Sequence, residues 1–261
     1  MRIMPSELMS DSGVLNSILQ YIATNYPPNI TCDCVIVGSS IASPLVAIGL
    51  ATEHSVVLVL QGTVPYEVKY SYQGAVGVAI FRRDAIEILK EHGLVEECSS
   101  GDLLVMDLYT LMIKAVARCL ERKVKVLLPA NFRDVLYARE LQKYVVQGVV
   151  VEIGNFTMCI RSRAIVDATE NALVVETALR SVPYLEVPTP DGTVIGLRGY
   201  WVEEASRAMV ANTRKVLPGI VVCSLAANAV FGSPRPVLDM TPVVLSARKA
   251  AQLVRTELRK Q

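Results

Sequence analysis

The sequence predicts an α/β protein with a Rossmann-like, FAD/NAD dinucleotide-binding three-layer fold, and three observations lead to this prediction. Residues 34–37 read as a buried strand, a turn follows at Gly38, and residues 44–51 and 55–60 read as a helix and a second strand. Further apolar runs alternate with amphipathic helices, which is typical of a largely parallel sheet. Residues 130–160 depart from this alternation and predict a β-meander insertion.

Length and composition narrow the class further. The 261 residues are 52% hydrophobic with a net charge of +1, so the chain can bury a large core and offers no electrostatic case for nucleic acid. No apolar run reaches the ~18 residues that cross a membrane, and the N-terminus lacks a signal-peptide pattern. We therefore expect one domain over residues 1–261, cytoplasmic, with neither nucleic acid nor membrane as a partner.

The first half of the chain predicts a series of helices and short strands. An N-terminal helical arm at residues 1–30 contains an amphipathic helix at 11–25. Tyr66, Tyr70 and Tyr72 lie in a loop, where we interpret them as cover for the core or an interface, with an aromatic ligand wall as the alternative. The elements expected next are a helix at 84–92, a strand at 104–106, a helix at 108–122 and a strand at 124–128.

The second half adds the meander and returns to the parallel sheet. The expected elements are meander strands at 135–137, 145–153 and 156–160, a buried parallel strand at 164–169, an irregular stretch around Pro183 to Pro190, a helix at 201–213, a strand at 219–223 and a terminal helix at 243–259. We expect the terminal helix to pack against the first strand.

The cysteines and histidines match no metal template. Their spacing fits no zinc motif, so we interpret the cysteines as small buried apolar residues, with a disulfide or metal role as the alternative. His54 and His92 are interpreted as helix C-terminal residues that complement the helix dipole. The cysteines are Cys32, Cys34, Cys98, Cys119, Cys159 and Cys223.

The turn after the first strand is an altered dinucleotide fingerprint. The pattern Gly-x-Gly-x-x-Gly places a pyrophosphate on a helix N-terminus. Gly38 supplies the turn glycine, but Ser40 and Ser43 replace the second and third glycines. The acidic residue expected after the second strand is Gln61. The sequence therefore predicts the architecture of a nucleotide site with altered ligand chemistry.

Three segments near the C-terminus resemble the thiamine thiazole synthase family, above all its archaeal branch. They are residues 212–220, 226–235 and 245–251, and the most specific is Ala-Ala-Asn-Ala-Val-Phe-Gly-Ser-Pro-Arg at 226–235. The resemblance continues backward through 164–169, 87–93 and the opening unit, so it covers nearly the whole chain. It implies NAD and glycine as substrates, an adenylated thiazole for thiamine as product, iron assistance, and ring-like homo-octamers.

Carried over residue by residue, the resemblance implies a damaged active site. The sulfur-donor position falls at Gly154, and the two iron-ligand positions fall at Phe156 and Asn171. Iron requires imidazole, thiolate or carboxylate ligands, which neither residue offers. We therefore expect no catalytic residue, no metal ligand and no iron, with Cys159 as a displaced sulfur donor in the alternative.

Two glycine-rich loops of the family are also altered. Residues 67–73 replace one of them, and residues 237–242 replace the other, where Pro242 has no N–H to offer a ligand. Arg235 is retained, and the resemblance implies that it clamps a carboxylate. Its alternative role is a structural ion pair.

We expect a nucleotide-binding or assembly paralogue that lacks iron-dependent catalysis. The alternatives are an active thiazole synthase with a rearranged site, or a flavin- or NAD-binding protein of another function. The ligand would be NAD or an NAD-derived adenine nucleotide, and the chain would form a homo-oligomer, or a hetero-oligomer with an active paralogue. The predicted binding residues are Gly38, Ser39, Ser40, Ala42, Gln61, Phe132, Thr169 and Arg235.

Overall fold

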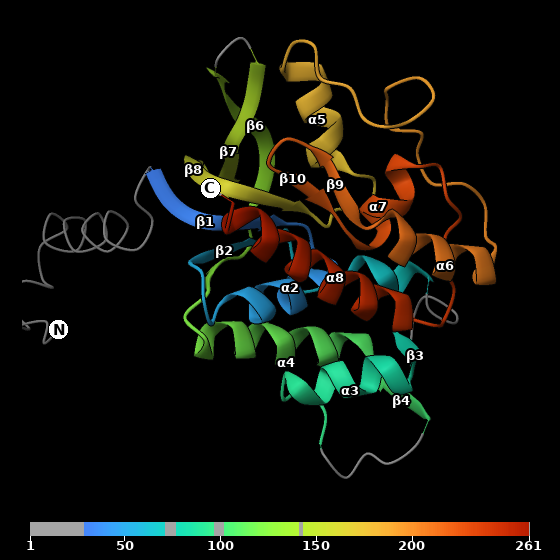
Figure 1. The fold of residues 1–261 in the computed structure, drawn as a ribbon. Coiled ribbons are helices and arrows are strands. Elements are labelled where there is room, and N and C mark those ends of the chain that lie inside the picture. Colours follow the sequence, from blue (N-terminus) through green and yellow to red (C-terminus); the bar gives the residue numbers. More distant parts are fainter. Residues whose placement is uncertain (1–28, 71–76, 97–101, 141–142, 261) are drawn as a thin grey trace, which may run out of the picture.

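The computed structural model describes residues 29–70, 77–96, 102–140 and 143–260 (Figure 1). The predicted helix at 11–25 lies outside the described residues, as do Tyr72 and Cys98.

The centre of the fold is a sheet in the order β5-β2-β1-β8-β10-β9, in which all but the last strand run parallel. The chain starts at β1, moves outward through β2 to β5, and then returns to β8 on the other side of β1. Ligands of such sheets bind beyond the carboxyl ends of the strands where this reversal occurs. The strands are β1 (Asn29–Val37), β2 (Val56–Val59), β5 (Lys125–Leu127), β8 (Phe156–Asp167), β9 (Arg214–Leu217) and β10 (Ile220–Val222).

The predicted meander is present, and its last strand is longer than expected. The strands β6 (Asn131–Glu140), β7 (Lys143–Ile153) and β8 pair antiparallel in sequence. The prediction of separate strands at 156–160 and 164–169 was wrong, because β8 runs unbroken from the meander into the parallel sheet. Exposed Arg161 and Arg163 interrupt the apolar pattern without ending the strand.

Helices cover both faces of the sheet, so the three-layer prediction is confirmed. One buried cluster joins a face of the sheet to α2 (Ala42–Leu50), α3 (Arg83–Glu91), α4 (Leu108–Glu121) and α8 (Thr241–Leu258). The opposite cluster joins the meander to α5 (Leu173–Ser181) and α7 (Ser224–Val230). Figure 1 shows these helices on the two sides of the strands.

The terminal helix α8 is placed differently from the prediction. It packs mainly along α2, α3 and α6 (Val202–Asn212) instead of against β1. Small residues permit this approach, since a Cβ on Gly49 of α2 would lie 3.3 Å from the Cβ of Ala251. A small antiparallel sheet of β3 (Val78–Arg82) and β4 (Leu103–Asp107) flanks these helices, and the sequence predicted only β4.

The buried thiols and His92 behave as packing residues. Cys32, Cys34, Cys119 and Cys223 are buried and Cys159 is half-buried, and none of these five forms a disulfide. Burial lowers the pKa of His92 to about 4, so this side chain is uncharged at neutral pH. His92 caps the C-terminus of α3, as the sequence predicted, and its burial disfavours the charged form.

Candidate functional site

The turn between β1 and α2 requires glycine. Gly38 has φ +127, and a Cβ there would lie 2.3 Å from the carbonyl oxygen of Ala168 at the end of β8. Both the backbone angle and the close approach exclude a side chain. The start of α2 therefore lies tightly against the carboxyl ends of β1 and β8, where a sheet of this kind presents its ligand site.

The first amides of α2 are satisfied within the chain. The N–H of Ile41 donates to Glu67 Oε2 at 3.1 Å, and the N–H of Ala42 donates to Ser40 Oγ at 3.0 Å. The N–H of Ser43 donates to the carbonyl oxygen of Ser40 at 3.0 Å, and Pro44 has no N–H. Free amides at a helix N-terminus form an anion site. The amides of Ile41, Ala42 and Ser43 all donate within the chain, so they are not free to bind an anion in this arrangement.

Glu67 places a carboxyl group at this helix start. Its side chain is fully buried, and Oε1 lies 2.5 Å from Ser40 Oγ and 3.2 Å from Ser224 Oγ. The two serine oxygens are 3.0 Å apart, so the three groups form one buried cluster. Burial raises the pKa of Glu67, while hydrogen bonds from Ser40, Ile41 and Ser224 act against that rise. A buried carboxyl group is tolerated here because its oxygens are hydrogen-bonded.

The short helix η1 (Tyr66–Tyr70) carries Glu67 and is bonded to residues that follow β1, β2 and β8. The N–H of Tyr66 donates to the carbonyl oxygen of Ser39 at 3.0 Å, and its hydroxyl donates to Gln61 Oε1 at 2.7 Å. Lys69 Nζ lies 2.7 Å from Glu170 Oε2, just beyond β8. The segment thus bridges the ends of β2 and β8.

Four predicted binding residues lie together, around a hollow that is almost filled. Gly38, Gln61, Phe132 and Thr169 line a cavity of ≈ 10 Å³, together with Tyr66. That volume corresponds to about one water molecule, whereas ligand pockets usually measure about 300–1,000 Å³. The predicted residues are therefore neighbours, but the space between them does not hold a nucleotide in this arrangement.

Three other predicted residues serve local contacts. Ser39 Oγ accepts from the N–H groups of Gln61 at 3.1 Å and Gly62 at 3.3 Å. Ser40 and Ala42 belong to the helix start described above. Arg235 lies elsewhere: its Nη1 donates to the carbonyl oxygen of Arg198 at 2.7 Å, and its guanidinium is 5.9 Å from the ring of Tyr200.

Thr169 and the buried Asp167 form a helix cap. Asp167 Oδ1 accepts from the N–H and hydroxyl of Thr169 at 3.0 and 2.7 Å, and Oδ2 accepts from the N–H of Val175 at 3.0 Å. Thr169 Oγ1 accepts from the N–H of Leu173 at 2.7 Å. These bonds hold the first turn of α5, a helix that the sequence pattern did not predict. Burial raises the pKa of Asp167.

The positions that the resemblance assigns to sulfur and iron do not fit a metal. Gly154, Phe156 and Asn171 are exposed, and Phe156 retains 59% of its surface. Their side chains provide no thiolate, imidazole or carboxylate. Among the residues that the structure describes, no group of three or more His, Cys, Asp or Glu side chains is placed to hold a metal ion.

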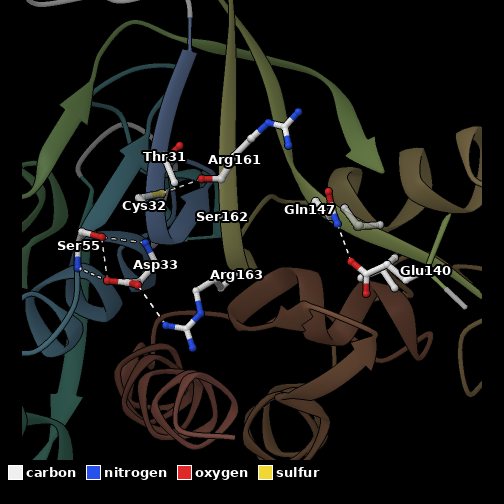
Figure 2. Close-up of a pocket in the computed structure, with 11 residues that line it drawn as sticks. Thr31, Cys32, Asp33, Ser55, Glu140, Gln147, Arg161, Ser162 and Arg163 are labelled. Carbon is white, nitrogen blue, oxygen red and sulfur yellow. Dashed lines mark hydrogen bonds and ion pairs between the residues drawn. The ribbon is translucent and has the colours of Figure 1, made fainter. Parts of the chain in front are cut away.

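A larger groove lies at the opposite, amino edge of the sheet (Figure 2). Its volume is ≈ 550 Å³, and Asp33 and Arg163 lie in its wall. Asp33 Oδ2 accepts from the N–H and hydroxyl of Ser55, both at 2.8 Å, and Asp33 Oδ1 lies 3.4 Å from Arg163 Nη1. Ligands of this sheet type bind at the carboxyl ends of the strands, so the groove lies at the edge opposite the expected ligand site.

The sequence pointed to Tyr66 but not to Glu67 or Ser224 as parts of the site. Tyr66 was interpreted as cover, which agrees with its position over the cavity. Glu67 was noted only as part of a replaced glycine-rich loop. An acidic residue between Tyr66 and Val68, in a segment where the resemblance implies a glycine-rich loop, was the one available signal.

The reversed strand order, the glycine turn and the helix start define a Rossmann-like protein of the dinucleotide-binding class. Within that class, the model of the Thi4 family matches residues 17–242, and the chain belongs to the Thi4 family. This finding confirms the resemblance seen in the sequence.

Similar proteins agree with this family. The thiamine thiazole synthase of Archaeoglobus fulgidus is 26% identical, over 95% of this chain and 96% of the relative. That of Methanothermobacter thermautotrophicus is 27% identical, over 66% and 69%. A crystal structure of Thermovibrio ammonificans THI4 has a TM-score of 0.81 at 20% identity and covers 96% of this chain and 99% of that chain. The structural likeness supports the fold.

The helices of the described residues can be compared with the length and hydropathy that a membrane span requires. Within the described ranges, none of the helices is long and apolar enough to cross a bilayer.

Proposed function

We propose that this protein is a divergent member of the Thi4 family that keeps the fold but does not carry out iron-dependent thiazole formation. The observation that carries the proposal is the donor set at the implied sulfur and iron positions. Gly154, Phe156 and Asn171 replace a sulfur donor and two ligands, and transition metals are held by imidazole, thiolate or carboxylate groups. The role that remains is that of a non-catalytic paralogue, acting in assembly or, if the site at the start of α2 opens, through a bound adenine nucleotide.

A reconstitution assay tests the loss of chemistry. The purified protein is incubated without oxygen with Fe(II), NAD, glycine and sulfide, and the adenylated thiazole is sought by mass spectrometry. The thiamine thiazole synthase of Archaeoglobus fulgidus serves as the positive control. We expect product from the control only. Product from this chain, or iron retained at one equivalent after dialysis, overturns the proposal.

The second candidate is an active thiazole synthase with a rearranged site. Its support is the match to the family model over most of the chain and the names of the relatives. The half-buried Cys159 on β8 would be its candidate sulfur donor. Replacement of Cys159 by Ser would abolish product formation in that case. A flavin-binding protein is the third candidate, and a colourless preparation argues against it.

Assembly is the positive part of the proposal. We propose a homo-oligomer, with an octamer implied by the resemblance, or a hetero-oligomer with an active paralogue, located in the cytoplasm. Native mass spectrometry of the protein alone and mixed with an active relative measures this directly. A monomer under both conditions removes the assembly role.

A further inference from the structure

We propose that Glu67 is a built-in occupant of the phosphate position at the N-terminus of α2, so that the chain closes its own nucleotide site. The inference goes beyond the loss of iron chemistry, because it concerns whether a nucleotide binds at all. It rests on the contacts of Glu67, on the cavity beside it and on the way η1 is held.

The carboxyl group takes the hydrogen bonds that an anion would take. A phosphate at a helix start is bound by backbone N–H groups and nearby hydroxyls. Glu67 accepts from the N–H of Ile41 at 3.1 Å and lies 2.5 Å from the hydroxyl oxygen of Ser40. A second hydroxyl, that of Ser224, lies 3.2 Å away. A phosphate at this position would need these same donors.

A nucleotide cannot be accommodated beside Glu67 in this arrangement. The cavity lined by Tyr66, which precedes Glu67, and by Gly38 and Thr169 measures ≈ 10 Å³. Binding therefore requires Glu67 to leave, and its departure would uncover the donors of Ser40 and Ile41.

The segment that carries Glu67 is positioned to keep it in place. Tyr66 bonds to Ser39 on one side, and Lys69 pairs with Glu170 on the other. Since Lys69 is 63% exposed, its ion pair contributes little, and the buried contacts of Glu67 itself provide the main restraint. Removing the carboxyl group should therefore matter more than removing the ion pair.

The test measures binding of ADP and of inorganic pyrophosphate by isothermal titration calorimetry on the full chain. The variants are Glu67→Ala, which removes the carboxyl group, Glu67→Gln, which keeps its shape, and Glu170→Ala as the matched control. We expect no binding by the original protein up to about 1 mM, and a gain of at least about tenfold for Glu67→Ala. Glu67→Gln should gain less, and Glu170→Ala should resemble the original protein.

The outcomes separate this proposal from the proposed function. Micromolar binding of ADP by the original protein overturns it, as does a folded Glu67→Ala variant, judged by circular dichroism, that gains no affinity. If Glu67→Ala does not fold, the original protein and Glu67→Gln still decide, because strong binding by the original protein is sufficient to refute. Iron content and thiazole formation are separate measurements, so either idea can fail alone.

Discussion

The two edges of the central sheet show opposite solutions for polar side chains. At the carboxyl edge, Glu67 and Asp167 are fully buried, and the neighbouring cavity measures ≈ 10 Å³. At the amino edge, Asp33 and Arg163 line an open groove of ≈ 550 Å³. Buried polar groups need complete hydrogen bonding, whereas exposed ones can exchange protein partners for water. The carboxyl edge has the smaller cavity, but its buried polar groups depend more on their hydrogen-bond partners than those of the amino edge do.

The largest expected effect is at the glycine turn of the carboxyl edge. Gly38→Ala should destabilise the protein by about 3–4 kcal/mol, because it adds both backbone strain and a clash with the carbonyl oxygen of Ala168. Gly154→Ala is the control, since Gly154 has φ +58 but no atom within 4 Å of the new Cβ. It should cost only about 1 kcal/mol. Urea unfolding measures both, and equal losses would mean that the carboxyl edge is not closely packed.

The next effect compares two aspartates, one from each edge. Asp167→Asn should cost about 2–3 kcal/mol, because an amide N–H₂ would face donors from Thr169 or Val175. Asp33→Asn should change the free energy of unfolding by less than about 1 kcal/mol, since water can replace its partners. Denaturant unfolding at pH 7 gives both values. A larger loss of unfolding free energy for Asp33→Asn than for Asp167→Asn would show that the amino edge depends more on its hydrogen bonds than the carboxyl edge does.

The pH dependence of stability should have opposite signs at the two edges. Burial raises the pKa of Glu67 above 4.5, so its contribution is complete below pH 4.5 and is lost as the pH rises through the raised pKa. Hydrogen bonds from Ser55 lower the pKa of Asp33 below 3.8, so its contribution is present above pH 3.8 and is lost as the pH falls through the lowered pKa.

Unfolding free energies of the original protein, Glu67→Gln and Asp33→Asn across pH 3–9 test these signs. The advantage of the original protein over Glu67→Gln should shrink as the pH rises above 4.5 and through the raised pKa of Glu67. Tyr66 and Cys223 are titratable groups that interact with Glu67, and both proteins share them. An advantage that grows with pH would show that Glu67 is favoured as the ion.

The smallest effect belongs to the ion pair at the amino edge. Arg163→Ala should lower stability by less than about 1 kcal/mol, because Arg163 is 43% exposed and its pair with Asp33 spans 3.4 Å. The loss should be smaller in high salt, because salt screens this exposed pair, while the part due to the short-range bond to the Leu258 carbonyl oxygen should remain. Thermal unfolding at two salt concentrations measures it. A loss of stability close to that of Asp167→Asn would contradict the idea that the polar contacts of the amino edge contribute less than those of the carboxyl edge.

Much of the fold was predictable because its signals are local. The opening unit, α3, α4, the strands of the meander and α8 follow from periodicity and from Gly and Pro at element ends. Helices α5 and α7 escaped because the residues before them, Ala172 and Cys223, make no side-chain cap. The first turn of α5 is held instead by Thr169 and by Asp167 from the preceding strand. On α4, Leu120 belongs to the apolar residues of the helix but is 59% exposed, so the buried stripe of that helix is narrower than its sequence suggests.

The sequence by itself determined the parallel sheet, the need for glycine at position 38 and the residue types at positions 154, 156 and 171. These depend on side-chain chemistry and on patterns a few residues long. Only the tertiary structure decided what occupies the start of α2. The bond from the amide of Ile41 to Glu67 spans 26 residues, and the contact of Glu67 with Ser224 spans 157. Such contacts exist only after the sheet has brought the carboxyl ends of its strands together, and no local pattern encodes them.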